Sequence, residues 1–345
     1  MIKKIFYIFI ILFSSFTFSQ LSKTHYIPPI TSGPSNADPI DQYIYISTPS
    51  AGDVNFTINT IGSTSVSGTV SNANPYRHTI SSGGYSSFVQ DPASTREVTS
   101  DKGFIIEADS PIYVSVRLNA GNSAQAGALV SKGENALGTT FRIGTYNSEN
   151  ANNSNNRANY LSFFSIMATE DNTIVNLTHE RVSSGLNLQG IDGQFPINNI
   201  VLNRSQTYTV AINLSENIGI EDALIGTLIN SDKPIVVNSG SANGSFADAG
   251  ARDYGIDQIV ELSKVGKEYI FVRGDGADSY ENILVVPHED NTEVYVNGDT
   301  NPVANISAGS YYIIEGDSYT NNNMYVSTSK DVFIYQGVGG LNTQG

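Results

Sequence analysis

The hydrophobic and polar positions of the chain alternate in short runs, and this pattern predicts β-strands almost throughout. Runs such as YIYIS (43–47) and VNFTI (54–58) are rich in β-branched and aromatic residues, and several place an apolar side chain at every second position. Between the runs lie clusters of Gly, Asn, Asp and Ser, which favour turns. No segment has the sustained apolar spacing of an amphipathic helix, and the best helical candidate, residues 255–264, is short. The pattern therefore predicts an all-β protein.

Three short motifs recur along the chain and indicate an internal repeat. The turn motif EDNT begins at Glu170 and again at Glu289. The second motif occurs as ADSPIYV (108–114), as SDKPIVV (231–237) and in a looser form as SKDVFIY (329–335). The third motif occurs as GTTFRIG (138–144) and as GKEYIFV (266–272). We predict a Pro-rich, partly extended lead-in at residues 20–41. Three β units follow it, at residues 42–145, 146–272 and 273–345.

The repeats also suggest the architecture of each unit. Asp and Asn in EDNT suit a tight hairpin, because both tolerate positive φ and bond to nearby backbone donors. The unit length of about 110–120 residues favours tandem β-sandwich-like units with Greek-key connections over the alternative, a propeller-like ring of short strands. We expect the third unit to be incomplete, because the sequence stops before a copy of the closing strand motif.

The N-terminus has the features of a secretory signal peptide over residues 1–19. Lys3 and Lys4 precede an apolar run over residues 5–13, which is much shorter than the ~20 residues that a membrane span needs. Small residues at the end of this segment predict cleavage before Gln20. No second long apolar stretch follows, so the sequence predicts a secreted or cell-surface chain without a transmembrane segment after cleavage.

Composition and charge exclude several functional classes. The chain has 33 Asp and Glu against 18 Lys and Arg, for a net charge of −15. This balance argues against a nucleic-acid partner, whose phosphates would have to be neutralised by Lys and Arg. The absence of Cys excludes a disulfide framework, a thiolate nucleophile and a Cys-ligated metal.

The sequence predicts a protein that is not an enzyme. It contains no HExxH metal motif, no GxSxG nucleophile elbow and no phosphate-binding P-loop. The four His residues are widely separated, although His179 and His288 lie beside predicted turns. A hydrolase that uses two carboxylates about 5–10 Å apart is an alternative, but nothing in the sequence selects such a pair.

Two groups of residues are candidates for binding. Asp275, Asp278 and Glu281 lie in the acidic loop GDGADSYEN and form a possible calcium site, because calcium takes six to eight oxygen ligands. No other cofactor is expected. Tyr and Phe in strands serve mainly as core residues or cross-strand pairs. A surface platform for sugars or partner proteins is the alternative, and its first candidates are Tyr311, Tyr312 and Tyr319.

Three segments together resemble a known family: GTLINSDKPIVVNSGSA (226–242), DYGIDQIVELSKVGKEYIFVRG (253–274) and NILVVPHEDNTEVYVNG (282–298). They are similar to the N-terminal domain of IgGFc-binding-protein-like proteins. Residues 103–146 are similar to the version found in large secreted Bacteroidetes proteins, which commonly end in a gliding-motility-associated, type IX secretion sorting domain. The resemblance covers nearly all of residues 25–345. It implies an extracellular or cell-surface location and a binding or adhesion role, without established catalytic residues. Animal members carry Cys and this chain has none, so IgG binding is not transferred.

These observations favour a secreted or cell-surface binding or adhesion module of a larger exported bacterial protein, with an extracellular protein or glycan as its partner. One alternative is a secreted hydrolase that acts on polysaccharides. Another is a non-catalytic structural stalk. A deep cleft with two facing carboxylates would favour the hydrolase, whereas shallow faces with exposed aromatic side chains would favour binding. The stalk predicts no concave polar site.

Overall fold

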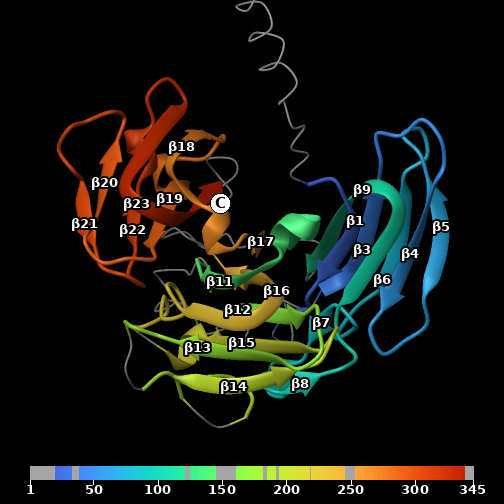
Figure 1. The fold of residues 1–345 in the computed structure, drawn as a ribbon. Coiled ribbons are helices and arrows are strands. Elements are labelled where there is room, and N and C mark those ends of the chain that lie inside the picture. Colours follow the sequence, from blue (N-terminus) through green and yellow to red (C-terminus); the bar gives the residue numbers. More distant parts are fainter. Residues whose placement is uncertain are drawn as a thin grey trace, which may run out of the picture.

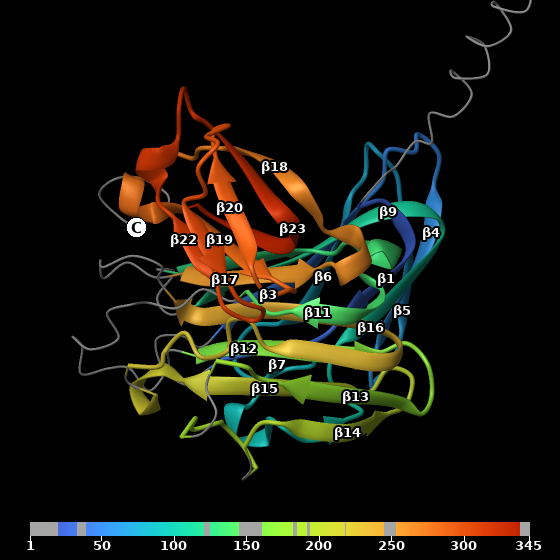
Figure 2. The ribbon, with the colours of Figure 1, turned by 60° about the vertical axis from the view of Figure 1, so that its left-hand side comes forward.

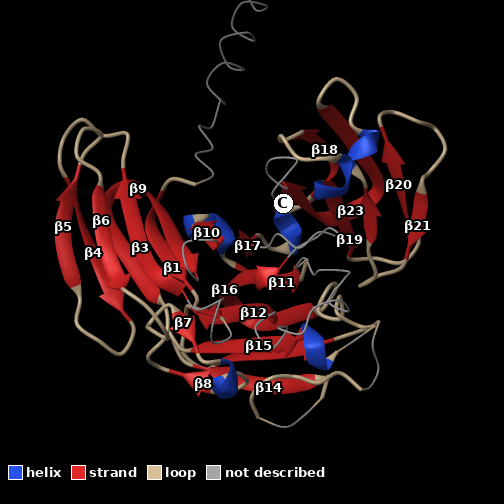
Figure 3. Cartoon of the chain, turned by 180° about the vertical axis from the view of Figure 1, so that it is seen from behind, coloured by secondary structure: helices blue, strands red, loops and turns tan. Residues whose placement is uncertain are grey.

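A computed structural model describes residues 20–32, 39–120, 125–144, 161–181, 185–191, 194–217, 219–244 and 253–338. The predicted signal peptide at residues 1–19 lies outside these ranges. The described residues form β-strands and short 3₁₀ helices, with no α-helix. Figure 3 shows the strands in red and the short helical segments in blue. The all-β prediction is confirmed. Within the same ranges, no helix has the length and apolar character that crossing a bilayer requires.

The strands form three main sheets, with the first and third standing on either side of the second (Figures 1 and 2). The first sheet contains β1 (Ser22–Ile27), β3 (Pro39–Ser47), β4 (Val54–Thr60), β5 (Val66–Val70), β6 (Tyr76–Ser81), β9 (Phe104–Ala120) and β10 (Gln125–Val130). The second contains β8 (Val98–Thr99), β11 (Gly138–Arg142), β12 (Leu161–Ala168), β13 (Thr173–Thr178), β14 (Ile197–Leu202), β15 (Thr207–Asn213), β16 (Leu228–Gly244) and β17 (Asp253–Ile259). The third contains β18 (Gly266–Val272), β19 (Glu281–Pro287), β20 (Thr292–Val296), β21 (Ala304–Ile306), β22 (Tyr312–Ile314) and β23 (Asn323–Val338).

One long strand organises each sheet: β9, β16 and β23, with 17, 17 and 16 residues. The first half of β9 lies between β1 and β4, and its second half lies between β3 and β10. The strand thereby joins two layers, whose inward side chains pack into one apolar cluster that includes Ile46, Phe56 and Val116. The predicted sandwich-like arrangement is confirmed. Motifs ADSPIYV, SDKPIVV and SKDVFIY occupy the middle of the three long strands.

The two EDNT turns have the same local geometry. Asn172 and Asn291 have positive φ, at 53° and 55°, which Asn tolerates better than most residues. The hydroxyl groups of Thr173 and Thr292 each donate to the carbonyl three residues earlier, at 2.8 and 2.7 Å. However, β12 and β13 both pair with β16 and not with each other, and β19 and β20 both pair with β23. The predicted hairpin is therefore wrong: each turn carries the chain from one side of the long strand to the other.

The sheet boundaries also differ from the predicted unit boundaries. β11 pairs with β16 of the second sheet, and β18 pairs with β23 of the third. Motifs GTTFRIG and GKEYIFV therefore begin the following sheet, whereas we expected them to close the preceding unit. The third sheet already includes such a strand in β18. Part of the predicted lead-in pairs as well, since β1 lies beside β9. Similarity between repeats reveals their period, but not the residue at which each repeat begins.

Two small elements join the first and second sheets. β2 (Ile30–Thr31) pairs in parallel with β7 (Val89–Gln90), and β8 pairs with β15 of the second sheet. Buried polar groups cross the same boundary: the side-chain amide of Asn238 donates to the carbonyl of Pro28 at 2.8 Å, and that of Gln258 donates to the carbonyl of Tyr26 at 2.8 Å. The two sheets are therefore joined by paired backbone and by satisfied buried hydrogen bonds.

Candidate functional site

The outer face of the first sheet carries a surface that we call the tyrosine–arginine face, made of Tyr43, Tyr45, Arg77, Tyr113 and Arg117. Alternation along β3 buries one set of side chains and turns Tyr43 and Tyr45 outward. Antiparallel pairing places Arg117 opposite Tyr43, and Arg77 opposite Tyr45. Directly opposite residues share a face of the sheet, so side chains from β3, β6 and β9 meet there. Both arginines are exposed, and Tyr113 is 39% exposed.

Each arginine of this face lies over the tyrosine diagonal to it. The guanidinium carbon of Arg77 is 4.8 Å from the ring centroid of Tyr43, and that of Arg117 is 5.3 Å from the centroid of Tyr45. The two rings are 6.3 Å apart and meet edge to face. Cation–π contacts at exposed sites contribute about 0.5–1 kcal/mol each. They hold long side chains in a fixed arrangement, which lowers the entropy lost when a ligand binds.

The tyrosine–arginine face has the composition of a protein interaction surface. Tyr and Arg are enriched at the energetic centres of interfaces. The guanidinium fork also matches carboxylate and sulfate or phosphate groups. A carboxylate lies at the margin, where the hydroxyl of Tyr43 donates to Asp41 at 3.2 Å. This hydrogen bond raises the pKa of the Tyr43 hydroxyl.

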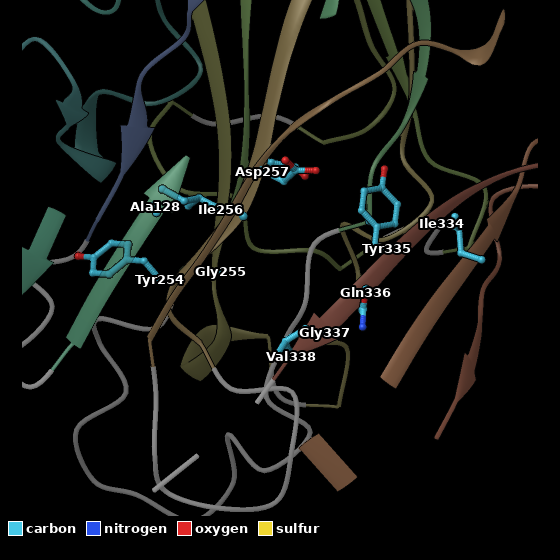
Figure 4. Close-up of a pocket in the computed structure, with 13 residues that line it drawn as sticks. Ala128, Tyr254, Gly255, Ile256, Asp257, Ile334, Tyr335, Gln336, Gly337 and Val338 are labelled. Atoms are coloured by element: carbon cyan, nitrogen blue, oxygen red, sulfur yellow. The ribbon is translucent and has the colours of Figure 1, made fainter. Parts of the chain in front are cut away.

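A second candidate is a groove of about 520 Å³ between β17 and the second half of β23, bordered by β10 (Figure 4). Tyr254 and Tyr335 lie on its two sides, and each hydroxyl is hydrogen-bonded: to Ser32 at 2.6 Å and to the carbonyl of Arg142 at 2.7 Å, respectively. Asp257 is the one carboxylate among the described lining residues, and it pairs with Lys132 at 2.6 Å. The groove therefore lacks the two facing carboxylates that would favour a hydrolase.

The second and third sheets meet around a buried arginine. Arg142 is 2% exposed and donates to the carboxylate of Glu180 at 2.9 and 3.2 Å and to the carbonyl of Gly226 at 2.9 Å. Nearby, burial and the charge of Arg181 lower the pKa of His179 to about 4. Burial also lowers the pKa of His288. Both histidines therefore lie neutral at this junction at pH 7.

The predicted calcium loop has protein partners for two of its three carboxylates. Glu281 is fully buried, and its carboxylate accepts backbone N–H groups of Gly274 and Gly276 at 2.9 and 2.8 Å. Asp278 pairs with Arg273 at 2.6 Å. Across the part of the chain that the structure describes, no group of three or more acidic or histidine side chains is arranged to hold a metal ion. Calcium binding by Asp275, Asp278 and Glu281 stays a prediction.

The tyrosines expected to form a surface platform are instead packing residues. Tyr312 and Tyr319 pack against the apolar cluster of the third sheet. Tyr311 faces the second sheet, where its hydroxyl donates to Asp222 at 2.7 Å and its ring lies 4.7 Å from the guanidinium of Arg181. The outward-facing tyrosines described above, Tyr43, Tyr45 and Tyr113, lie in the first sheet. The alternation in YIYIS signalled that two tyrosines share a face, but not that this face is uncovered.

No curated protein matches the chain. One solved structure, described as giving structural insight into host cell surface retention of a 1.5-MDa bacterial ice-binding adhesin, has 10% identity and a TM-score of 0.13, over 93% of this chain and 100% of that chain. This score is too low to support an argument. The sequence profile described as IgGFc binding protein matches residues 126–345. Because that match spans more than half of the chain, the chain belongs to the IgGFc binding protein family.

Proposed function

We propose that this chain is a secreted, non-catalytic adhesion module that binds an acidic extracellular macromolecule through the tyrosine–arginine face. The observation that carries the proposal is the interleaved stack of Arg77 and Arg117 on Tyr43 and Tyr45. Membership of a family named for binding supports a binding role. The signal peptide predicted at residues 1–19 supports export, and the resemblance to large secreted bacterial proteins supports a place within a longer surface protein.

The charge of the chain explains why an acidic ligand needs a local site. At a net charge of −15, most of the surface repels a polyanion, so attraction depends on cations gathered at one place. Arg77 and Arg117 provide these gathered cations on the tyrosine–arginine face. Val130 is 42% exposed and lies opposite Ser115, so it adds apolar area to the same face. The ligand is expected to carry carboxylates in an extended array, because each guanidinium can form two parallel hydrogen bonds with a carboxylate.

The experiment measures binding of the purified chain to two immobilised carboxylate polymers, poly-L-glutamate and polygalacturonate, with neutral dextran as reference. We expect binding to at least one carboxylate polymer. The binding should weaken steeply as the salt concentration rises from about 50 to about 300 mM, because salt screens the attraction between surface charges. The polymer that binds distinguishes a protein-like ligand from a glycan.

The decisive variant is the double substitution Arg77→Gln and Arg117→Gln, which removes both charges and keeps polar side chains at exposed positions. The matched control is Tyr295→Ser with Tyr325→Ser in the third sheet, where the tyrosine hydroxyls donate to Glu293 and Glu268 instead. Binding should fall about tenfold or more in the arginine variant and stay unchanged in the control. Equal binding by both variants would refute the proposed site.

A further inference from the structure

The outer face of the third sheet carries a surface that we call the tyrosine–glutamate face, made of Glu268, Ile270, Val272, Glu293, Tyr295 and Tyr325. Alternation along β18 turns one set of side chains into the apolar cluster of the sheet and leaves the other set outside. Antiparallel pairing places Ile270 of β18 opposite Tyr325 of β23, and Tyr295 of β20 opposite Ser327 of β23. Directly opposite residues share a face of the sheet, so side chains from three strands meet there.

This face exposes apolar side chains that the repeat itself does not require. Ile270 and Val272 are 74% and 65% exposed, the two highest fractions among the large apolar side chains of the described residues. The corresponding face of the first sheet, along β4 and the first half of β9, is polar: Asn55 donates to Asp109 at 2.8 Å there. An exposed apolar patch on one repeat and not on its counterpart indicates a surface that another molecule covers.

The tyrosines of this face hold its two carboxylates in place. The hydroxyl of Tyr325 donates to Glu268 at 3.0 Å, and the hydroxyl of Tyr295 donates to Glu293 at 2.7 Å. A carboxylate has about four sites that accept hydrogen bonds, so one tyrosine leaves room for a guanidinium group, which donates two parallel hydrogen bonds. The tyrosine–glutamate face therefore combines apolar side chains with two oriented negative charges.

We propose that the tyrosine–glutamate face binds the tyrosine–arginine face of a second copy of this chain. Glu268 and Glu293 supply the negative charges of one face. Arg77 and Arg117, stacked on tyrosine rings, supply the positive charges of the other. Opposite charges fix which surfaces meet, while Tyr and Arg are residue types enriched where interfaces gain most of their affinity.

Contact between two unlike faces joins the copies head to tail. The first and third sheets stand on either side of the second (Figures 1 and 2), so the two faces belong to separate parts of one molecule. An interface of this kind repeats from copy to copy and builds a ring or an open chain. The inference rests on the proposed function in one respect, because it uses the same tyrosine–arginine face. An acidic ligand and a second copy therefore compete for the same arginines.

Sedimentation velocity of the purified chain tests the association. The chain has a net charge of −15, so the assay uses about 150 mM salt, at which the Debye length is about 8 Å and long-range repulsion is screened. We expect the mean sedimentation coefficient to rise as the protein concentration approaches about 1 mM, a range in which even a Kd of about 1 mM is detected. A chain that stays monomeric throughout overturns the proposal.

Two double variants test which faces meet. Arg77→Gln with Arg117→Gln removes the charges of one face, and Glu268→Gln with Glu293→Gln removes those of the other. Each variant alone should associate about tenfold or more weakly than the unchanged chain. An equimolar mixture contains one intact copy of each face, so it should associate with the original affinity and stop at pairs. A mixture that behaves as its components do separately overturns the proposal.

The apolar part of the face is tested with Ile270→Ser and Val272→Ser together. The matched control is Ile174→Ser with Val201→Ser, because these two residues are 38% and 52% exposed and lie opposite each other on the second sheet. Association should weaken about tenfold in the first variant and stay unchanged in the control, with thermal melting used to verify that both fold. Equal effects of the two substitutions contradict the proposal.

The carboxylate-polymer assay separates this inference from the proposed function. Association without polymer binding refutes the function and leaves the inference standing, whereas polymer binding without association refutes the inference alone. Where both occur, soluble poly-L-glutamate should dissociate the copies, because it occupies the arginines that the second copy needs. Association that persists while the polymer is bound shows that the two partners do not share the tyrosine–arginine face, and the inference is then wrong.

Discussion

The hydroxyl group of Tyr335 donates a hydrogen bond of 2.7 Å to the backbone carbonyl of Arg142. This contact joins β23, the long strand of the third sheet, to β11 of the second sheet. The Tyr335 ring also packs against the apolar clusters of both sheets. One tyrosine thereby fixes the spacing of the two sheets and one wall of the groove.

Substituting Gly144→Ala should loosen this junction. A Cβ at Gly144 would lie 2.0 Å from the Tyr335 ring, so the ring must move, and overpacking of this kind costs about 1–3 kcal/mol. Chemical denaturation measures the loss in the free energy of unfolding. Gly266→Ala is the control, because a Cβ there meets nothing within 4 Å. Similar stability of the two variants would show that the ring is not held against Gly144.

The buried arginine at the same junction provides a second prediction. Glu180→Gln removes the negative partner of Arg142, whose side chain is 2% exposed. A buried charge without its partner destabilises a fold strongly; since the Glu180 side chain is 41% exposed, we expect a loss of about 1–3 kcal/mol. Glu289→Gln is the matched control. Its ion pair with Lys330 is exposed and 3.7 Å long, so its removal should cost less than about 1 kcal/mol. The prediction is wrong if the two losses are equal in denaturation.

The protein should become less stable as the pH is lowered, because of His25. Burial lowers the pKa of His25 to about 4, and its Nε2 contacts the carbonyls of Ser22 and Ile112 at 3.2 and 3.0 Å. Between pH 6.5 and 4 the unfolded chain binds a proton that the folded chain does not. The stabilising contribution is therefore complete above pH 6.5 and is lost as the pH falls towards 4, by about 1.4 kcal/mol per pH unit.

Urea denaturation at several pH values from 4 to 7.5 measures this slope. His25→Gln should reduce the slope of the free energy of unfolding against pH by the contribution of one histidine. His78→Gln is the comparison. Burial lowers the pKa of His78 as well, but His78 is only partly buried, whereas His25 is fully buried. A slope that is unchanged in the His25 variant would mean that this group does not govern the acid sensitivity.

The third sheet should open before the other two. Its apolar cluster contains 8 buried residues among those described, against 21 in the second sheet, and less buried apolar surface gives less free energy to offset chain ordering. In hydrogen exchange, amides in NILVV and VFIYQ should lose protection before those in PIYVSV and PIVVN. Equally slow exchange in all four segments would contradict this expectation.

Local features of the fold were predictable from the sequence. Alternating apolar positions and turn-forming clusters predict an all-β chain, because side-chain alternation and turn preference are properties of neighbouring residues. The recurrence of EDNT identified two equivalent turns, and the positive φ of Asn172 and Asn291 explains why Asn recurs there. The two tyrosines of YIYIS were also predictable as sharing one face.

The tertiary structure alone decided which strands meet and which faces stay open. The EDNT turns cross a long strand because that strand, some 60 residues later for β12 and β16, pairs with both strands that the turn joins. Tyr43 stands on the outer face of its sheet, whereas Tyr319 packs against an apolar cluster. This difference depends on what covers each side of a sheet, and the covering residues are distant in the sequence. Burial and pairing are long-range properties, since their free energy comes from contacts between segments that no local pattern specifies.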